Sequence, residues 1–150
     1  MKSDRLWNHA AVALAAALII YTIAYRSIEH RRVRNGPWQV TFTNASGQPA
    51  IAINEPKLAI TNVQIVFPGE ALPGTNFSRT LAFDQPHEVP YDIPLGKCIF
   101  MDTTFLPGTI VFELFGHEIQ LIPRVLTIDK KEIAWRSNAV ITLPRTNSSR

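Results

Sequence analysis

An almost uninterrupted run of apolar residues occupies positions 6–25, LWNHAAVALAAALIIYTIAY, and contains no Asp, Glu, Lys or Arg. About 20 residues at about 1.5 Å rise each allow a helix to cross a bilayer. The run ends at Arg26, and Arg31, Arg32 and Arg34 follow it closely. This basic flank is typical of a retained helix, whereas a cleaved signal peptide, the competing interpretation, ends in a small-residue site. We therefore predict a short tail over 1–5 and a transmembrane helix over 6–25, which can extend to about residue 34.

The pattern becomes alternating after the turn signal Asn35-Gly36-Pro37. Trp38, Val40 and Phe42 alternate with polar residues, which predicts a half-buried strand. The segment 58–67 also reads as a strand, and its apolar phase shifts at Thr61-Asn62, which predicts a bulge there. We expect further strands over 50–53, 77–83, 97–101, 109–115, 118–122, 124–128, 132–135 and 139–143.

The last third of the chain is the most regular part of this pattern. Residues 109–115 are nearly all apolar, which predicts a central strand buried on both faces. Gly116-His117 fits a two-residue hairpin turn, with His117 at the surface. We expect the strands that follow, through residue 143, to complete a β-meander.

Eight to ten short strands without a helical period predict an antiparallel β-sandwich over residues 37–145, with a small β-barrel as the alternative. Residues 146–150 are expected to form a flexible tail. Six prolines fall between 68 and 107, so much of that segment is expected to be ordered loop. Loops on a rigid scaffold are common binding surfaces, although prolines also stiffen loops and protect sheet edges.

The charge is distributed unevenly. Residues 1–34 carry six Lys or Arg and two Asp or Glu, a net charge of +4, whereas residues 35–150 carry nine and ten, a net charge of −1. The basic pI of about 9.3 therefore belongs to the membrane-flanking segment. A domain without basic excess is not expected to bind nucleic acid.

The side of the membrane that holds the domain has two conflicting indications. Four arginines follow the helix (Arg26, Arg31, Arg32 and Arg34) and two basic residues precede it, which favours a cytoplasmic domain. A short tail, one helix and a Cys-poor β domain form a plan common among extracytoplasmic bacterial proteins. We expect an extracytoplasmic domain on a bacterial inner membrane. Interfacial contacts with lipid are expected from these arginines and from Trp7, Tyr21 and Tyr25.

The helix is rich in alanine. Ala11 and Ala15, and likewise Ala13 and Ala17, are four residues apart, which permits close approach of another transmembrane helix. The alternative is a helix that simply faces lipid.

Candidate chemistry in the domain is sparse. The sequence has no nucleophile elbow and no Gly-rich phosphate loop, so we expect neither an enzyme nor a cofactor. His87, Cys98, Met101 and His117 include the ligand types of a blue-copper site, but no His lies between Cys98 and Met101 as a compact copper loop requires. An apolar strand around Cys98 favours an inert buried thiol.

Three functions are compatible with these features. We expect a non-catalytic accessory subunit of a larger membrane complex, with lipid and other integral membrane proteins as partners. The alternatives are a membrane-tethered copper-handling or redox protein and a tethered ligand-binding module with its site in the loops of 68–107.

Overall fold

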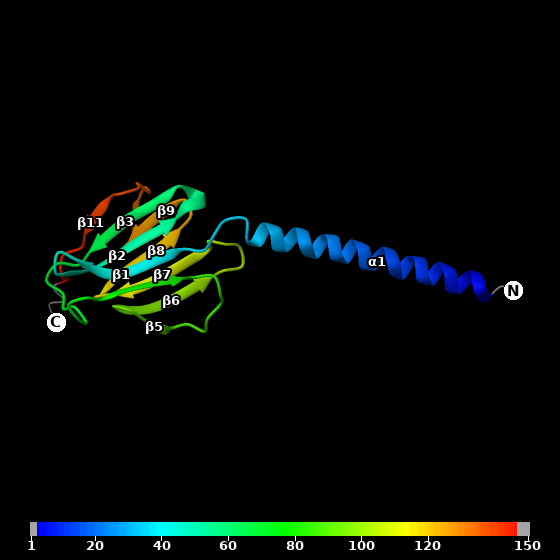
Figure 1. Cartoon of the computed structure of the whole chain (residues 1–150), viewed down its shortest axis with the longest axis horizontal. Coiled ribbons are helices and arrows are strands. Elements are labelled where there is room, and N and C mark those ends of the chain that lie inside the picture. Colours follow the sequence, from blue (N-terminus) through cyan, green and yellow to red (C-terminus); the bar gives the residue numbers. More distant parts are fainter. Residues whose placement is uncertain (1–2, 147–150) are drawn as a thin grey trace. The chain divides into compact units, whose positions relative to one another are not determined.

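The computed structural model of the chain describes residues 3–146, and the chain separates after Arg34 into two compact units. The first unit contains one continuous α-helix, α1 (Ser3–Arg32), drawn in blue in Figure 1. The helix thus includes residues 3–5 of the predicted tail and continues about two turns beyond the apolar run. The remainder of the two predicted tails, residues 1–2 and 147–150, lies outside the described residues.

Helix α1 is long and apolar enough to cross a membrane over Arg5–Arg32, and none of this span is buried in the protein. Its 30 residues correspond to about 45 Å, more than the roughly 30 Å of a hydrocarbon core. The Thr22 hydroxyl donates a hydrogen bond to the Leu18 carbonyl at 2.8 Å. Such a bond to the same helix leaves no unpaired hydroxyl toward lipid. By length, composition and exposure, α1 is a candidate membrane anchor.

The second unit is a β-sandwich of two sheets, which Figure 1 shows stacked face to face. The first sheet consists of β1 (Gln39–Ala45), β2 (Gln48–Glu55), β3 (Ile60–Val66), β4 (Ser78–Ala82) and β11 (Val140–Thr142). The second consists of β5 (Tyr91–Ile93), β6 (Gly96–Asp102), β7 (Thr109–Leu114), β8 (His117–Ile122), β9 (Val125–Ile128) and β10 (Lys131–Ile133). The orders are β11-β3-β2-β1-β4 and β10-β9-β8-β7-β6-β5. The predicted sandwich is confirmed, and residues 3–146 form one strand more than the expected eight to ten.

The core lies between the sheets and follows from the alternation along each strand. Val40 and Phe42 of β1 are fully buried, whereas Thr41 between them is not. Across the core, the ring of Phe42 meets the ring of Phe112 from β7 edge to face, with 6.3 Å between centroids. Each such side chain contributes about 1.5–3 kcal/mol by leaving water, which holds the sheets together without a disulfide.

The irregular region before β3 is partly as predicted. Pro56–Leu58 form a 3-10 turn, in which the Glu55 side chain accepts from the Leu58 N–H at 2.7 Å, so the strand begins at Ile60 and not at Leu58. The bulge is confirmed, because Thr61 and Asn62 together lie opposite Asn54 on β2. Asn62 has a positive φ of 50°, the conformation that lets the strand change phase.

Two predictions for the last third are wrong. The turn between β7 and β8 is formed by Phe115 and Gly116, both with positive φ, so His117 belongs to β8. A two-residue turn with both central residues in this conformation matches the twist of a hairpin. The meander also ends at β10, because β11 crosses to the first sheet and pairs parallel with β3.

The predicted burial of the segment 109–115 holds for its centre. Ile110, Val111 and Phe112 are all buried, and β7 lies between β6 and β8. Glu113 is exposed, so the strand is not buried on both faces along its whole length.

Candidate binding groove between strands β4 and β5

The two lateral sides of the sandwich differ. On the side of β10 and β11, Trp135 covers the core, with its ring 5.2 Å from that of Trp38 and its indole N–H donating to the Ile122 carbonyl at 2.8 Å. On the other side the sheets end in β4 and β5, and a groove of about 670 Å³ lies between these strands. Figure 1 shows β11 and β5 near opposite sides of the domain.

The floor of the groove is apolar and comes from both sheets. Leu81 and Phe83 contribute from the side of β4, and Tyr91, Ile93 and Met101 contribute from β5 and β6. All residues that line the groove fall between 73 and 101, within the proline-rich segment where the sequence indicated binding loops. The groove is therefore formed entirely by that segment.

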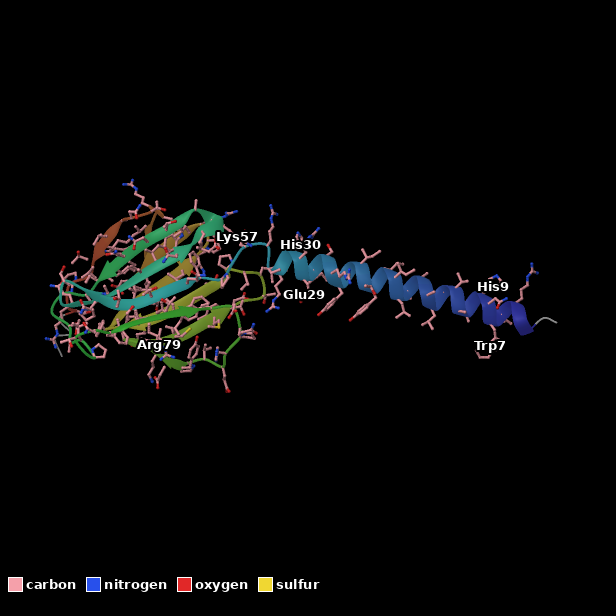
Figure 2. The ribbon with its side chains drawn as sticks, in the orientation of Figure 1. Trp7, His9, Glu29, His30, Lys57 and Arg79 are labelled. Atoms are coloured by element: carbon pink, nitrogen blue, oxygen red, sulfur yellow. The ribbon has the colours of Figure 1, made fainter. Side chains whose placement is uncertain are left out.

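One cation lies within this apolar surface. Arg79 of β4 is directly opposite Phe42 of β1, whose side chain is fully buried in the core. Residues directly opposite on neighbouring strands share a face of the sheet, so the Arg79 side chain leaves β4 on the inner face and lines the groove. Figure 2 labels it on the side of the domain where β5 also lies. Arg79 is exposed and forms no ion pair with any residue of the described chain.

The backbone of β4 has one free edge. The Phe83 N–H donates to the Trp38 carbonyl at 3.0 Å, which identifies this pair as hydrogen-bonded. Because such pairs alternate along an antiparallel ladder, Arg79 and Leu81 also bond to β1. The N–H and C=O groups of Ser78, Thr80 and Ala82 consequently point away from β1, where no further strand of residues 3–146 pairs with them.

Three of the four proposed metal-ligand residues lie at or near this groove. His87 lines it and stacks on Tyr91, with 4.8 Å between ring centroids, and Met101 lines it from β6. Cys98 pairs with Tyr91 across the β5–β6 ladder and is fully buried. His117 is not among the groove residues.

The Cys98 thiol is an inert part of the core. Burial raises its pKa, an effect that exceeds the opposing contributions of the Tyr91 hydroxyl and of the Phe100 backbone. The pKa of Tyr91 is raised as well, first by burial and then by Cys98. Both groups are therefore neutral at physiological pH, and a neutral thiol is a poor nucleophile.

His117 is buried, not at the surface as the sequence suggested. Its Nδ1 lies 2.6 Å from the Asp129 carboxylate and its Nε2 lies 3.1 Å from the Pro144 carbonyl. Both partners are hydrogen-bond acceptors. The Thr146 hydroxyl is also near Nε2, at 3.4 Å. This arrangement ties the chain after β11 to β8, a structural role.

Within residues 3–146, no three His, Cys, Asp or Glu side chains lie close enough together to hold a metal ion.

The alanine pairs of α1 lie on different faces. At about 100° per residue, Ala13 and Ala17 are rotated by about 200° from Ala11 and Ala15. A shallow hollow lies over Ala13 and Ala16, bordered by His9 and Val12, and of the four paired alanines only Ala13 lines it. Either face is open to another helix, but a single partner helix contacts one face only.

The predicted interfacial residues are exposed, apart from Arg32, which is half-buried. Trp7 is near the start of α1, whereas Tyr21 and Tyr25 stack on each other with 6.3 Å between centroids. Figure 2 shows Trp7 and His9 projecting from the first turns and Glu29 and His30 from the last. Arg32 lies 3.9 Å from Glu29. Arg26 and Arg31 belong to the last two turns of α1, and Arg34 follows the helix.

Sequence reasoning missed Arg79, although a signal for it exists. Phe77, Arg79, Leu81 and Phe83 occupy alternate positions, so the arginine falls in the apolar phase of its strand. A charge in that phase indicates either a guarded sheet edge or a binding site.

Comparison with protein-family models, with curated proteins and with solved structures finds no match to this chain. The class of the protein therefore follows from its own architecture: a β-sandwich domain preceded by a helix that is a candidate membrane span.

Proposed function

We propose that this protein is a non-catalytic, single-pass membrane protein that acts as an accessory subunit of a larger membrane complex. Its domain docks a partner, and its helix anchors the docking site at the membrane. The observation that carries this proposal is the groove beside β4, which combines a free strand edge, an apolar floor and an arginine without an ion pair among the described residues. A groove of this kind serves recognition without requiring a catalytic group.

The helix supports the same proposal. Small residues on an exposed, apolar helix permit the close approach that holds transmembrane helices together. Of the two alanine pairs, we propose the one that begins at Ala13 as part of the contact face, because a shallow hollow lies over Ala13 and Ala16. Lipid surrounds the rest of the helix, and the arginines from Arg26 onward meet the headgroups.

The test is the size of the particle after solubilisation from its native membrane in mild detergent. The protein is expected to migrate in a particle larger than a monomer in its micelle, together with a partner in fixed ratio. Ala13→Leu is expected to reduce the recovered partner, because it fills the indented face, whereas the matched variant Ala11→Leu leaves the recovery unchanged. A free monomer without a partner in wild type contradicts the proposal.

A tethered ligand-binding module is the second candidate, since the groove lies within the loops that suggested it. A small molecule that occupies the groove raises the unfolding temperature of the free chain by mass action. That rise would be lost in a variant such as Leu81→Arg, which obstructs the apolar floor. A module of this kind purifies as a monomer that binds small molecules, which separates it from the accessory subunit.

A further inference from the structure

We infer that the occupant of the groove is an extended segment of a partner protein, which adds as a strand to β4 and carries a carboxylate toward Arg79. This inference rests on the proposed docking function and names the chemistry of the docked segment.

The outer backbone edge of β4 favours the addition of a strand. Ser78, Thr80 and Ala82 offer N–H and C=O groups outward with the spacing of a strand, because β4 pairs with β1 alone among the strands of the described chain. An added strand satisfies these groups in the way that β-augmentation complexes do, with main-chain hydrogen bonds providing affinity. A compact small molecule cannot satisfy three residues of a strand edge at once.

The apolar floor of the groove favours a segment with alternate apolar side chains. A strand added to β4 directs every other side chain to the inner face of the sheet. Those side chains would meet Leu81 and Phe83 of the same sheet and Ile93 and Met101 of the opposite sheet, and so would complete the open side of the core. On the opposite side of the sandwich, Trp135 packs against the core, and the hollow there is smaller, at about 210 Å³. The groove thus corresponds to a place for one more strand.

The charge of Arg79 favours a docked segment that carries a carboxylate. Arg79 lies in the inner-face phase of β4 and has no ion-pair partner in residues 5–146. Of the other charged residues at the groove, Asp92 lies 3.7 Å from Lys97, and Asp84 follows β4. An arginine beside an apolar surface selects a carboxylate, with which it forms two parallel hydrogen bonds. The docked segment therefore alternates apolar residues and places Asp or Glu beside Arg79.

An inward-facing arginine on an edge strand can also serve to prevent edge-to-edge pairing. That interpretation predicts the reverse effect of removing the charge, because Arg79→Gln would then increase self-association. A second copy of the chain pairing through β4 is likewise a different occupant, which concentration-dependent dimerisation would reveal.

The test uses the full chain in mild detergent and fluorescent peptides of about eight residues, the length of an ordinary strand. One peptide alternates Thr and Val and has Glu at a central Val position, and the second has Lys there. Binding is measured by fluorescence anisotropy, with empty micelles as the blank. We expect the acidic peptide to bind and the basic peptide to bind at least about tenfold more weakly. The reason is that only the acidic peptide can form charge-assisted hydrogen bonds with Arg79.

Two variants locate the contact. Thr80→Pro removes an outward N–H that β1 does not use and is expected to weaken binding by about tenfold. Thr80→Val keeps the N–H and should bind like wild type. Arg79→Glu should exchange the preference, so that the basic peptide binds better than the acidic one. Near-ultraviolet circular dichroism of the Trp38–Trp135 pair verifies that each variant is folded.

Several results would overturn the inference: binding of neither peptide, equal binding of both, unchanged binding in Thr80→Pro, or Arg79→Gln that self-associates. If these results occur while the protein still purifies with a partner, the docking function stands and the strand mode is wrong. If the peptides bind as expected but the protein is a free monomer in its membrane, the accessory function fails and the recognition mode stands.

Discussion

The Cys98 thiol lies inside the core, and burial raises its pKa. We therefore expect alkylation by iodoacetamide at pH 8 to be at least about a hundredfold slower in the folded chain than in urea, since the thiolate is the reactive form. Mass spectrometry of the alkylated fraction over time gives both rates. Equal rates would mean that the thiol is accessible and that the groove reaches it.

Asp129 makes the stability of the fold depend on pH. Burial raises its pKa, but the hydrogen bonds from His117 and the Glu118 N–H, together with the charges of His117 and Lys131, outweigh this effect, so the folded-state pKa is lowered. The unfolded value is about 3.9. A lowered folded-state pKa contributes stability that is complete above the unfolded value and is lost as pH falls through the folded one.

Asp129→Asn should therefore reduce the dependence of the unfolding free energy on pH between about pH 5 and pH 3, as measured by urea titration. The expected loss at neutral pH is about 1 kcal/mol or less, because the Asp129 side chain is 44% exposed and solvent screens the pair. An identical pH profile in wild type and variant would show that the pair does not act as described.

At the scale of elements, the packing of β6 against β7 depends on a close approach of the two backbones at Gly96. A Cβ added to Gly96 would lie 2.1 Å from the Glu113 carbonyl oxygen on β7. Gly96→Ala should therefore lower the unfolding free energy by about 1–3 kcal/mol, because the backbone must shift. Urea denaturation followed by tryptophan fluorescence measures the loss.

Gly74→Ala is the matched control, since an added Cβ there meets no atom within 4 Å. Its unfolding free energy should equal that of wild type within about 0.5 kcal/mol. Equal losses in the two variants would contradict the close packing of β6 against β7.

The local pattern predicts most elements but not their exchange between sheets. Alternation at Trp38–Phe42 identifies β1, and the phase shift at Thr61-Asn62 identifies the bulge, because both depend on residues close in sequence. The turn at 115–116 is displaced by one residue from its prediction, since Phe115 adopts a conformation usually left to Gly or Asn. The short strand β11 reads like the next strand of a meander, and its place beside β3 depends on tertiary packing.

The groove could be predicted only in part. The proline-rich segment 68–107 indicates a binding region, and the arginine in the apolar phase of 77–83 indicates an unusual edge. That β4 and β5 end their sheets on the same side follows from sheet order, which the sequence pattern does not specify. The blue-copper set illustrates the converse, because residue types alone list His117 as a possible ligand, whereas in the fold its ring nitrogens lie against Asp129 and the Pro144 carbonyl.

At the scale of the whole molecule, the proposed location of the domain is the extracytoplasmic side of a bacterial inner membrane. The four arginines after the helix, against two basic residues before it, oppose this assignment, so it needs a direct test. In spheroplasts, added protease should degrade the domain, whereas in inverted membrane vesicles the domain should be protected until detergent is added. The reverse pattern would place the domain in the cytoplasm and its partners with it.

Pairing of a partner strand with β4 would protect the outward amides of β4, and amide hydrogen exchange measures this protection directly. In the purified free chain, the amides of Ser78, Thr80 and Ala82 should exchange rapidly, whereas those of Arg79 and Leu81, bonded to β1, should be protected. In the complex purified from its membrane, the three outward amides should become protected as well. Outward amides that exchange equally fast in the complex and in the free chain would contradict the account.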